Sequence, residues 1–97
     1  MNFEIAPKYT ETKLNWWDAK LYCFALNIRG KTGWRLPTKE ELGEISKTKN
    51  TLINGFYWSS TEDGPDFAWH QTVNNLNKLG CIRHMSIKYS VRAVRSI

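Results

Sequence analysis

Apolar residues in the first third of the chain recur with the period of an α-helix. Asn15, followed by Asp18 three positions later, has the side-chain type of an N-cap, so we expect a helix over residues 16–29. Large apolar residues fall at i, i+4, i+7, i+8 and i+11 of this segment, which predicts a buried stripe. The stripe consists of Trp17, Leu21, Phe24, Ala25 and Ile28. Gly30 is placed to end the helix in the left-handed conformation.

A second helix is predicted over residues 39–46, and the segment before it has a strong local signature. Thr38 and Glu41 form a capping-box pattern, S/T-x-x-E. Pro37 restricts its own φ and favours an extended residue before it. Trp34 and Leu36 alternate along this extended approach, so both are expected to lie in the core.

Alternation with a period of two, together with aromatic enrichment, predicts strands in the second half of the chain. The predicted strands cover residues 56–61, 67–73, 81–83 and 87–94, and residues 3–5 predict a short N-terminal edge strand. Polar segments at 47–51, 54–55, 62–66 and 74–80 predict the intervening loops and turns. Two helices followed by an antiparallel sheet indicate an α+β class, in one domain spanning residues 1–97.

Within the strand at 67–73, alternation separates Phe67, Trp69 and Val73 from Ala68, His70 and Thr72. We expect His70 and Thr72 to lie on the outward face of this strand. A lone histidine on a strand is more often a surface residue than a general base.

The chain has 97 residues, of which 13% are aromatic, and large rings let so short a chain bury a core. Its formal net charge is +5, and residues 78–97 contain five basic residues and no acidic one. This excess suits either a solvated sheet face or an acidic partner. No apolar run approaches the roughly 20 residues of a membrane span, and residues 1–7 lack a signal-peptide pattern. We therefore expect no membrane association.

Catalytic and metal-binding chemistry has little support in the sequence. The two cysteines and two histidines are widely separated, which makes a zinc site improbable. Asp63 and Asp66 flank Gly64-Pro65, and this composition favours a turn over a calcium loop. We expect no enzyme activity, no metal and no cofactor.

Several motifs occur in order along the chain: Trp16-x-x-Ala19, Gly33-Trp34-Arg35-Leu36-Pro37-Thr38, Tyr57-Trp58-Ser59-Ser60-Thr61, and Val91-Arg92-Ala93-Val94-Arg95. Together they resemble the small bacterial and phage domains of C-type-lectin-like fold, one of which forms the C-terminus of a bacterial collagen-like adhesin. Formylglycine-generating enzymes are more distant relatives. The resemblance implies that the first and last strands pair, with two helices flanking small antiparallel sheets. Structural roles are expected for Trp17, Cys23, Trp34, Arg35, Leu36, Pro37, Thr38, Glu41, Trp58, Trp69, Arg92 and Arg95.

The resemblance also bears on redox state. In these families the last strand usually carries a cysteine that bonds the cysteine of the first helix. This chain keeps Cys23 but has Ala93 at the partner position, and Cys81 is the alternative partner. Because a native disulfide in a small secreted domain contributes about 2–5 kcal/mol, its loss favours a reducing cytoplasm over an oxidising compartment.

We therefore expect a non-catalytic recognition domain that binds a protein partner, as a small phage-encoded effector or inhibitor in the bacterial cytoplasm. The alternative is a glycan-binding adhesin or virion receptor-binding module, and a nucleic-acid binder is less favoured. The oligomeric state stays open. The expected contact surface lies on the later strands and loops, and comprises Asp63, Asp66, His70, Thr72, Asn74, Asn75, Asn77, Lys78, Arg83, His84 and Lys88.

Overall fold

The computed structural model describes residues 2–47, 55–73 and 80–97, and it has the α+β class expected from the sequence. The predicted loop at 48–51, Asn54 and the polar segment at 74–79 lie outside the described residues. In chain order the elements are β1 (Phe3–Ile5), a 3₁₀ turn η1 (Lys8–Thr10), β2 (Thr12–Leu14), α1 (Trp16–Ala25), β3 (Trp34–Arg35), α2 (Lys39–Ser46), β4 (Gly55–Glu62), β5 (Phe67–Val73), β6 (Gly80–His84), β7 (Tyr89–Val91) and β8 (Val94–Ser96).

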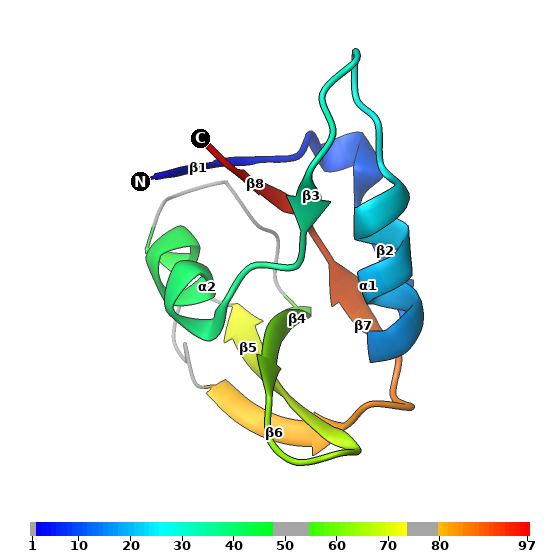
Figure 1. Cartoon of the computed structure of the whole chain (residues 1–97). Coiled ribbons are helices and arrows are strands. Elements are labelled where there is room, and N and C mark those ends of the chain that lie inside the picture. Colours follow the sequence, from blue (N-terminus) through cyan, green and yellow to red (C-terminus); the bar gives the residue numbers. More distant parts are fainter. Residues whose placement is uncertain (1, 48–54, 74–79) are drawn as a thin grey trace.

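The strands form two small sheets. One has the order β1-β8-β3, and the other has the order β2-β7-β4-β5-β6. All the strand pairs are antiparallel except β4 with β7, which are parallel. The N-terminal β1 pairs with the C-terminal β8, as the resemblance implied, so the two ends of the chain lie side by side (Figure 1).

Two tryptophan indoles tie α1 and the end of β2 to β4. Trp16 of α1 donates from Nε1 to the carbonyl oxygen of Ser59 in β4, at 2.8 Å. Trp58 of β4 donates from Nε1 to the carbonyl oxygen of Leu14, just before α1, at 3.1 Å. Ala19 and Cys23, three and seven residues after Trp16, are fully buried on the same side of the helix. This side of α1 therefore packs into the core.

The predicted buried stripe of α1 is wrong. Trp17, Leu21 and Phe24 are exposed to 44%, 67% and 82%, and Ala25 is exposed as well. Trp17, for which a structural role was expected, is thus only partly covered. The physical reason is that the indole bonds and the small Ala19 and Cys23 side chains set the rotation of the helix, and they override the amphipathic pattern.

The first helix also ends four residues earlier than predicted, at Ala25 rather than Arg29. Leu26 is the extended C-cap, and the Asn27 side chain accepts a hydrogen bond from the Gly30 amide at 2.9 Å. Arg29 and Gly30 both have positive φ, at 53° and 84°, in a two-residue turn closed by the Ile28–Lys31 bridge. Gly30 adopts the left-handed conformation as predicted, but it does so in this turn and not directly at the end of the helix. The hydrogen bond that Asn27 accepts competes with continuation of the helix.

The predicted segment before α2 is confirmed. Thr38 and Glu41 form the capping box, and Trp34, Leu36 and Pro37 are buried. Arg35 reaches across from β3 and donates to both carboxylate oxygens of Glu41, at 2.6 and 2.9 Å. These hydrogen bonds, more than any other contact, hold the pKa of Glu41 below its ordinary value of 4.5.

The face prediction for β5 is wrong for His70. Ala68 is buried in the core beneath α1, and His70 is buried among neighbouring rings at 2% exposure, whereas Phe67 is exposed. The side chains of Thr72 and Val73 are not described. On the opposite face Gln71 is also buried and Trp69 is partly buried beside Lys39 of α2, so both faces of this strand are covered.

The single strand predicted over 87–94 is also wrong, since β7 and β8 belong to different sheets. The chain passes between the sheets at Arg92 and Ala93. Arg92 donates from Nε to the Ala6 carbonyl oxygen at 2.6 Å, and the Ala6 amide donates to the Ala93 carbonyl oxygen at 2.9 Å. These bonds to the residue just after β1 fix the crossing point.

The structural roles expected for Arg92 and Arg95 are supported by their partners. Arg92 donates to Glu11 at 3.1 Å in a mostly buried ion pair, and Arg95 donates to Glu4 at 2.8 Å. Glu4 also pairs with Lys31 at 3.3 Å. Trp69 is partly buried, with the Lys39 ammonium 4.9 Å from its ring centroid.

Replacing Glu41 with Gln should make folding stability less sensitive to acid. A depressed folded-state pKa means that the ionised group stabilises the fold above its unfolded pKa, and that this contribution is lost as pH falls through the folded pKa. The free energy of unfolding of the parent protein, measured by urea denaturation at stepped pH, should fall below about pH 4.5 more steeply than that of Glu41→Gln. The free energy of unfolding of the variant should still fall somewhat in acid, because the pKa of Glu4 is also lowered, chiefly by its hydrogen bond from Arg95.

The matched control is Glu40→Gln, on the exposed side of the same helical turn, which should keep the parent acid dependence. Parallel curves for Glu41→Gln and the parent would contradict a stabilising role for the Arg35–Glu41 pair.

Candidate functional site

The outer side of α1 carries a row of uncovered apolar side chains. Trp17, Leu21 and Phe24 occupy positions i, i+4 and i+7, which lie on one side of a helix. Each of them is more than one third exposed. The row therefore lies opposite the Trp16–Ala19–Cys23 side that packs into the core.

This row continues onto the end of the five-stranded sheet. The ring of Trp17 lies edge-on to that of His84, with 6.4 Å between centroids, and His84 lies edge-on to Phe67 at 5.3 Å. Phe67 and His84 are directly opposite each other in the β5–β6 pair. We call the set Trp17, Leu21, Phe24, Phe67 and His84 the apolar band.

His84 has a defined orientation within this band. Its Nδ1 accepts a hydrogen bond from the Ser86 amide at 3.1 Å and lies 2.8 Å from the Ser86 hydroxyl. Because Nδ1 accepts, the proton of the neutral ring is on Nε2. The imidazole thus adds a rigid, partly polar ring between Trp17 and Phe67.

The apolar band has opposite charges at its two ends. Asp63 and Asp66 lie exposed in the turn before Phe67, and Arg29 lies exposed in the turn after α1. In Figure 1, α1 runs between these two turns along one side of the molecule. Lys20 lies on the helix itself, with its ammonium 4.9 Å from the Trp16 ring centroid.

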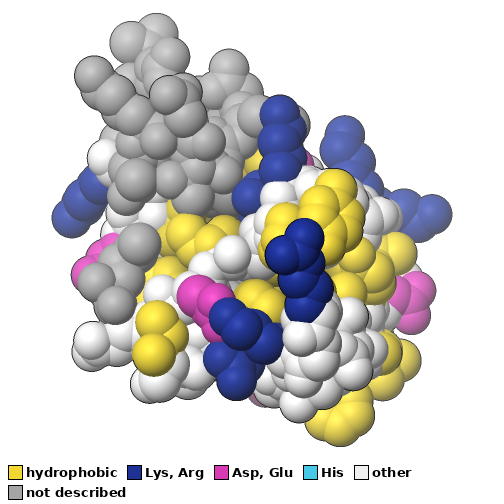
Figure 2. All heavy atoms as spheres, turned by 90° about the horizontal axis from the view of Figure 1, so that it is seen from above, with side chains coloured by type: hydrophobic (Ala, Val, Ile, Leu, Met, Phe, Trp, Pro, Cys, Tyr) yellow, Lys and Arg dark blue, Asp and Glu magenta, His cyan; other side chains and the backbone are white. Residues whose placement is uncertain are grey.

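The positive charge of the chain is widely distributed on the surface. Glu4, Glu11 and Glu41 are engaged in ion pairs with arginine, which leaves fewer carboxylates to balance the remaining cations. Figure 2 shows Lys and Arg side chains beside apolar ones across the face seen from above, with few carboxylates between them. Cationic and apolar side chains are therefore neighbours on this face of the molecule.

The residues predicted for the contact surface are only partly brought together. Four of them are exposed around the sheet end and its neighbouring turn: Asp63, Asp66, Arg83 and His84. The Thr72 side chain is not described, and Asn74, Asn75, Asn77 and Lys78 lie outside the described residues. Lys88 lies in a separate hollow, away from the apolar band.

The prediction that His70 lies on the outward face is wrong. Its ring lies among Phe56, Trp58 and Tyr89, at centroid distances of 5.5, 6.5 and 4.8 Å. Burial, with a smaller contribution from Arg83, lowers its pKa to about 4, so the ring is neutral at pH 7. Within the described part of the chain, neither ring nitrogen has a hydrogen-bond partner.

The sequence reasoning missed Trp17, Leu21, Phe24 and Phe67 as surface residues. A signal was present in the motif Trp16-x-x-Ala19 followed by Cys23, whose members fall at i, i+3 and i+7. That spacing defines a second helical face, and it is the one that packs. Two faces of one helix carried an apolar pattern, and only one of them is covered.

Cys23 is not a reactive thiol in the folded chain. Both cysteines are free, with Cys23 buried and Cys81 partly buried. Burial raises the pKa of the Cys23 thiol to about 12, which leaves it protonated at neutral pH. Across residues 2–47, 55–73 and 80–97, no cluster of three or more His, Cys, Asp or Glu side chains is arranged to hold a metal ion.

Comparison with known proteins decides the family. The family model of the Lcl C-terminal domain matches residues 3–95 of this chain, from β1 into β8. The chain belongs to the Lcl C-terminal domain family. No curated protein matches it. In this Lcl C-terminal domain, the described helices include none long and apolar enough to cross a membrane.

The two thiols of this Lcl C-terminal domain should differ sharply in reactivity. Cys81 is accessible enough to react with a thiol reagent in the native protein, whereas Cys23 should react only after unfolding. A count with Ellman's reagent should give about one thiol in buffer and two in denaturant, without prior reduction. Two thiols that appeared only after reduction would contradict the free state of the cysteines. The control variant Cys81→Ser identifies which thiol reacts in buffer.

Proposed function

We propose that this Lcl C-terminal domain is a non-catalytic recognition domain that binds a protein partner through the apolar band. The observation that carries this proposal is the exposure of Trp17, Leu21 and Phe24 in one helical row. The apolar band differs in position from the contact surface that the sequence predicted. Both surfaces include His84. Asp63 and Asp66, which belong to the predicted surface, lie beside the apolar band.

The uncovered row keeps free energy of burial available for binding a partner. Burying a Leu or Phe side chain is worth about 1.5–3 kcal/mol relative to exposing it. In this domain Leu21 and Phe24 contribute little of that to folding, because most of each side chain remains in water. The same free energy is available to association, and aromatic anchors such as Trp17 commonly dominate binding interfaces.

The geometry of the row favours a particular kind of partner. Anchors at i, i+4 and i+7 of one helix fit an apolar groove on another protein, in the helix-in-groove mode. Lys20 and Asp18 are both exposed on the same helix, so the charges beside the row are mixed. The partner is therefore a protein with an apolar groove.

We also infer that the fold is C-type-lectin-like. The pairing of β1 with β8 and the placement of two helices around two small sheets support this inference. Cys23 and Ala93 occupy the same core cluster, so the chain lacks a cysteine at the position that the family resemblance pairs with the helix cysteine. This supports a reducing compartment and a cytoplasmic partner, as for a small phage-encoded effector or inhibitor.

A photo-crosslinking residue placed at position 21 in the full chain tests the proposed surface. In lysate of the organism that encodes the chain, it should trap one protein, and the same residue at position 9 should not. Tyr9 is a matched control because it is also an exposed ring, on η1. With the trapped protein purified, Phe24→Ala should raise Kd by about tenfold or more, and Tyr9→Ala by less than about twofold.

Three results would refute the proposal. The first is equal crosslinking from positions 9 and 21, and the second is unchanged affinity in Trp17→Ala and Phe24→Ala. The third is a crosslink to a second copy, with a dimer in sedimentation, because the band would then be a self-association surface. Retention on heparin that Lys20→Gln and Arg83→Gln abolish but Phe24→Ala does not would favour the glycan alternative.

A further inference from the structure

Strand β6 forms one edge of the five-stranded sheet. Among the described strands it pairs with β5 alone, so its other side has no strand partner there. Figure 1 shows β6 along the lower margin of the molecule. The unpaired side of an edge strand carries backbone N–H and C=O groups with which another extended chain can pair. Apart from His84, this edge shares no residue with the apolar band.

The hydrogen bonding between β5 and β6 determines which residues of β6 point outward. Met85 donates its amide to the carbonyl oxygen of Asp66, opposite it, at 2.8 Å. Along an antiparallel pair, hydrogen-bonded and non-hydrogen-bonded positions alternate. Arg83 and Cys81, two and four residues before Met85, therefore bond to β5, whereas the N–H and C=O of Ile82 point away from it. The Ile82 amide has no backbone acceptor among the described residues.

The Ile82 carbonyl is covered by a side chain of the same strand. The Arg83 guanidinium donates to this oxygen at 2.9 Å, and the same nitrogen donates to the Cys81 sulfur at 2.6 Å. Arg83 is exposed and forms no ion pair with any described carboxylate. Basic side chains on edge strands commonly guard against unwanted strand pairing. A chain that pairs with Ile82 must therefore draw this guanidinium away from the carbonyl.

An acidic side chain on the added strand supplies the group that does this. On the outer side of β6, Arg83 occupies a non-hydrogen-bonded position, where the side chains of opposite antiparallel strands lie closest. A carboxylate is a stronger acceptor for a guanidinium than a neutral carbonyl oxygen is. β6 itself contains no acidic residue that could take this role. An acidic residue opposite Arg83 therefore opens the edge, and a neutral residue does not.

The neighbouring position favours an apolar residue. Ile82 is 38% exposed and lies opposite Trp69 of β5, on the other face of the sheet from Arg83. A residue opposite Ile82 on an added strand would lie on this face and extend the row that Trp69 and Ile82 begin. A second copy of the chain is a poor occupant, because each copy carries a net charge of +5.

We propose that β6 binds an extended acidic segment of another protein by antiparallel strand addition. The backbone of this segment bonds the Ile82 amide and carbonyl, one of its carboxylates pairs with Arg83, and an apolar side chain lies opposite Ile82. β6 and the outer row of α1 are different surfaces, so failure of binding at one leaves the other untouched.

Titration of the full chain with acetyl-Val-Glu-Val-Glu-Val-amide, followed by backbone ¹H–¹⁵N resonances, tests this site. Binding should saturate at millimolar concentration. At about ten times Kd, the Ile82 amide should exchange with solvent about tenfold more slowly, because only the free chain exposes it. Exchange of the Arg83 amide, which already bonds β5, should change little.

Two control peptides separate the contacts. A peptide with Gln in place of both Glu residues should bind about fivefold more weakly, through the lost charge opposite Arg83. A Glu peptide with a methyl group on the central Val nitrogen lacks the N–H that bonds the Ile82 carbonyl. It should bind at least about tenfold more weakly.

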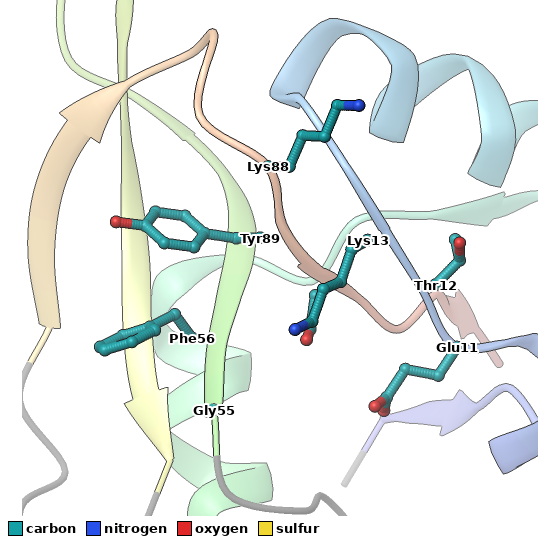
Figure 3. Close-up of a pocket in the computed structure, with 8 residues that line it drawn as sticks. Glu11, Thr12, Lys13, Gly55, Phe56, Lys88 and Tyr89 are labelled. Carbon is teal, nitrogen blue, oxygen red and sulfur yellow. The ribbon is translucent and has the colours of Figure 1, made fainter.

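Three variants locate the site. Arg83→Gln should bind the Glu and Gln peptides equally, to within about twofold, because the guanidinium is the source of the preference. Ile82→Pro removes an amide that β5 does not use, and should weaken binding by about fivefold or more. Lys88→Gln should leave binding unchanged. Lys88 lies beside Phe56 and Tyr89 at a hollow before β7, which β4 and β5 separate from β6 (Figure 3).

Four results would overturn the proposal. The first is no saturable binding of the Glu peptide at millimolar concentration, and the second is equal binding of its N-methylated form. The third is a preference for Glu over Gln that survives in Arg83→Gln but disappears in Lys88→Gln. The fourth is protection of the Ile82 amide in the free chain that increases with protein concentration, because a second copy would then occupy β6.

Discussion

The Trp16 indole and the small side chains on the same side of the helix set the rotation of α1 on the five-stranded sheet, and the apolar band depends on that rotation. Trp16 bonds the backbone of β4, and Trp58 of β4 bonds the backbone just before α1. Each bond joins residues more than 40 positions apart in sequence and also buries a large ring. The Trp16 bond ties α1 itself to β4, and the Trp58 bond ties β4 to the last residue of β2, two positions before α1 begins, so the start of the helix is held close to β4.

The rotation determines which of two apolar helix faces is covered. Ala19 and Cys23 are small, so the side that carries them can approach the sheet closely. The larger residues Trp17, Leu21 and Phe24 are then left outside. At its N-terminal end, α1 brings Trp17 beside His84 and Phe67. The fold thereby converts a pattern that normally marks a core into an exposed band.

The parts of the fold that could be predicted from sequence are those governed by local chemistry. Asn15 at the start of α1 and the Thr38–Glu41 capping box act within four residues, and both are present as expected. The Trp34–Leu36–Pro37 approach is also local. Non-local contacts decided the rest: the α1 face was fixed by β4, and the break at Arg92 was fixed by Ala6. His70 was misplaced because period-two alternation identifies two faces of a strand without indicating which residues are buried, and rings of β4 and β7 cover this histidine.

The candidate site was harder to predict for the same reason. Its members come from α1, β5 and β6, and only the packing of these elements brings Trp17, His84 and Phe67 into contact. Charge patterns pointed to the later strands, and Asp63, Asp66 and His84 do lie at or beside the band. The apolar residues of the band were assigned to the core because a regular stripe is ordinarily buried.

The most direct test of this account is the free energy of unfolding of Leu21→Ser/Phe24→Ser, measured by urea denaturation beside Ala19→Leu. If the outer row is uncovered, the double variant should stay within about 0.5 kcal/mol per substitution of the parent. Ala19→Leu should lose about 1–3 kcal/mol, through overpacking against the sheet. A loss of several kcal/mol in the double variant, with Ala19→Leu neutral, would show that the helix packs by the opposite face and would contradict the account.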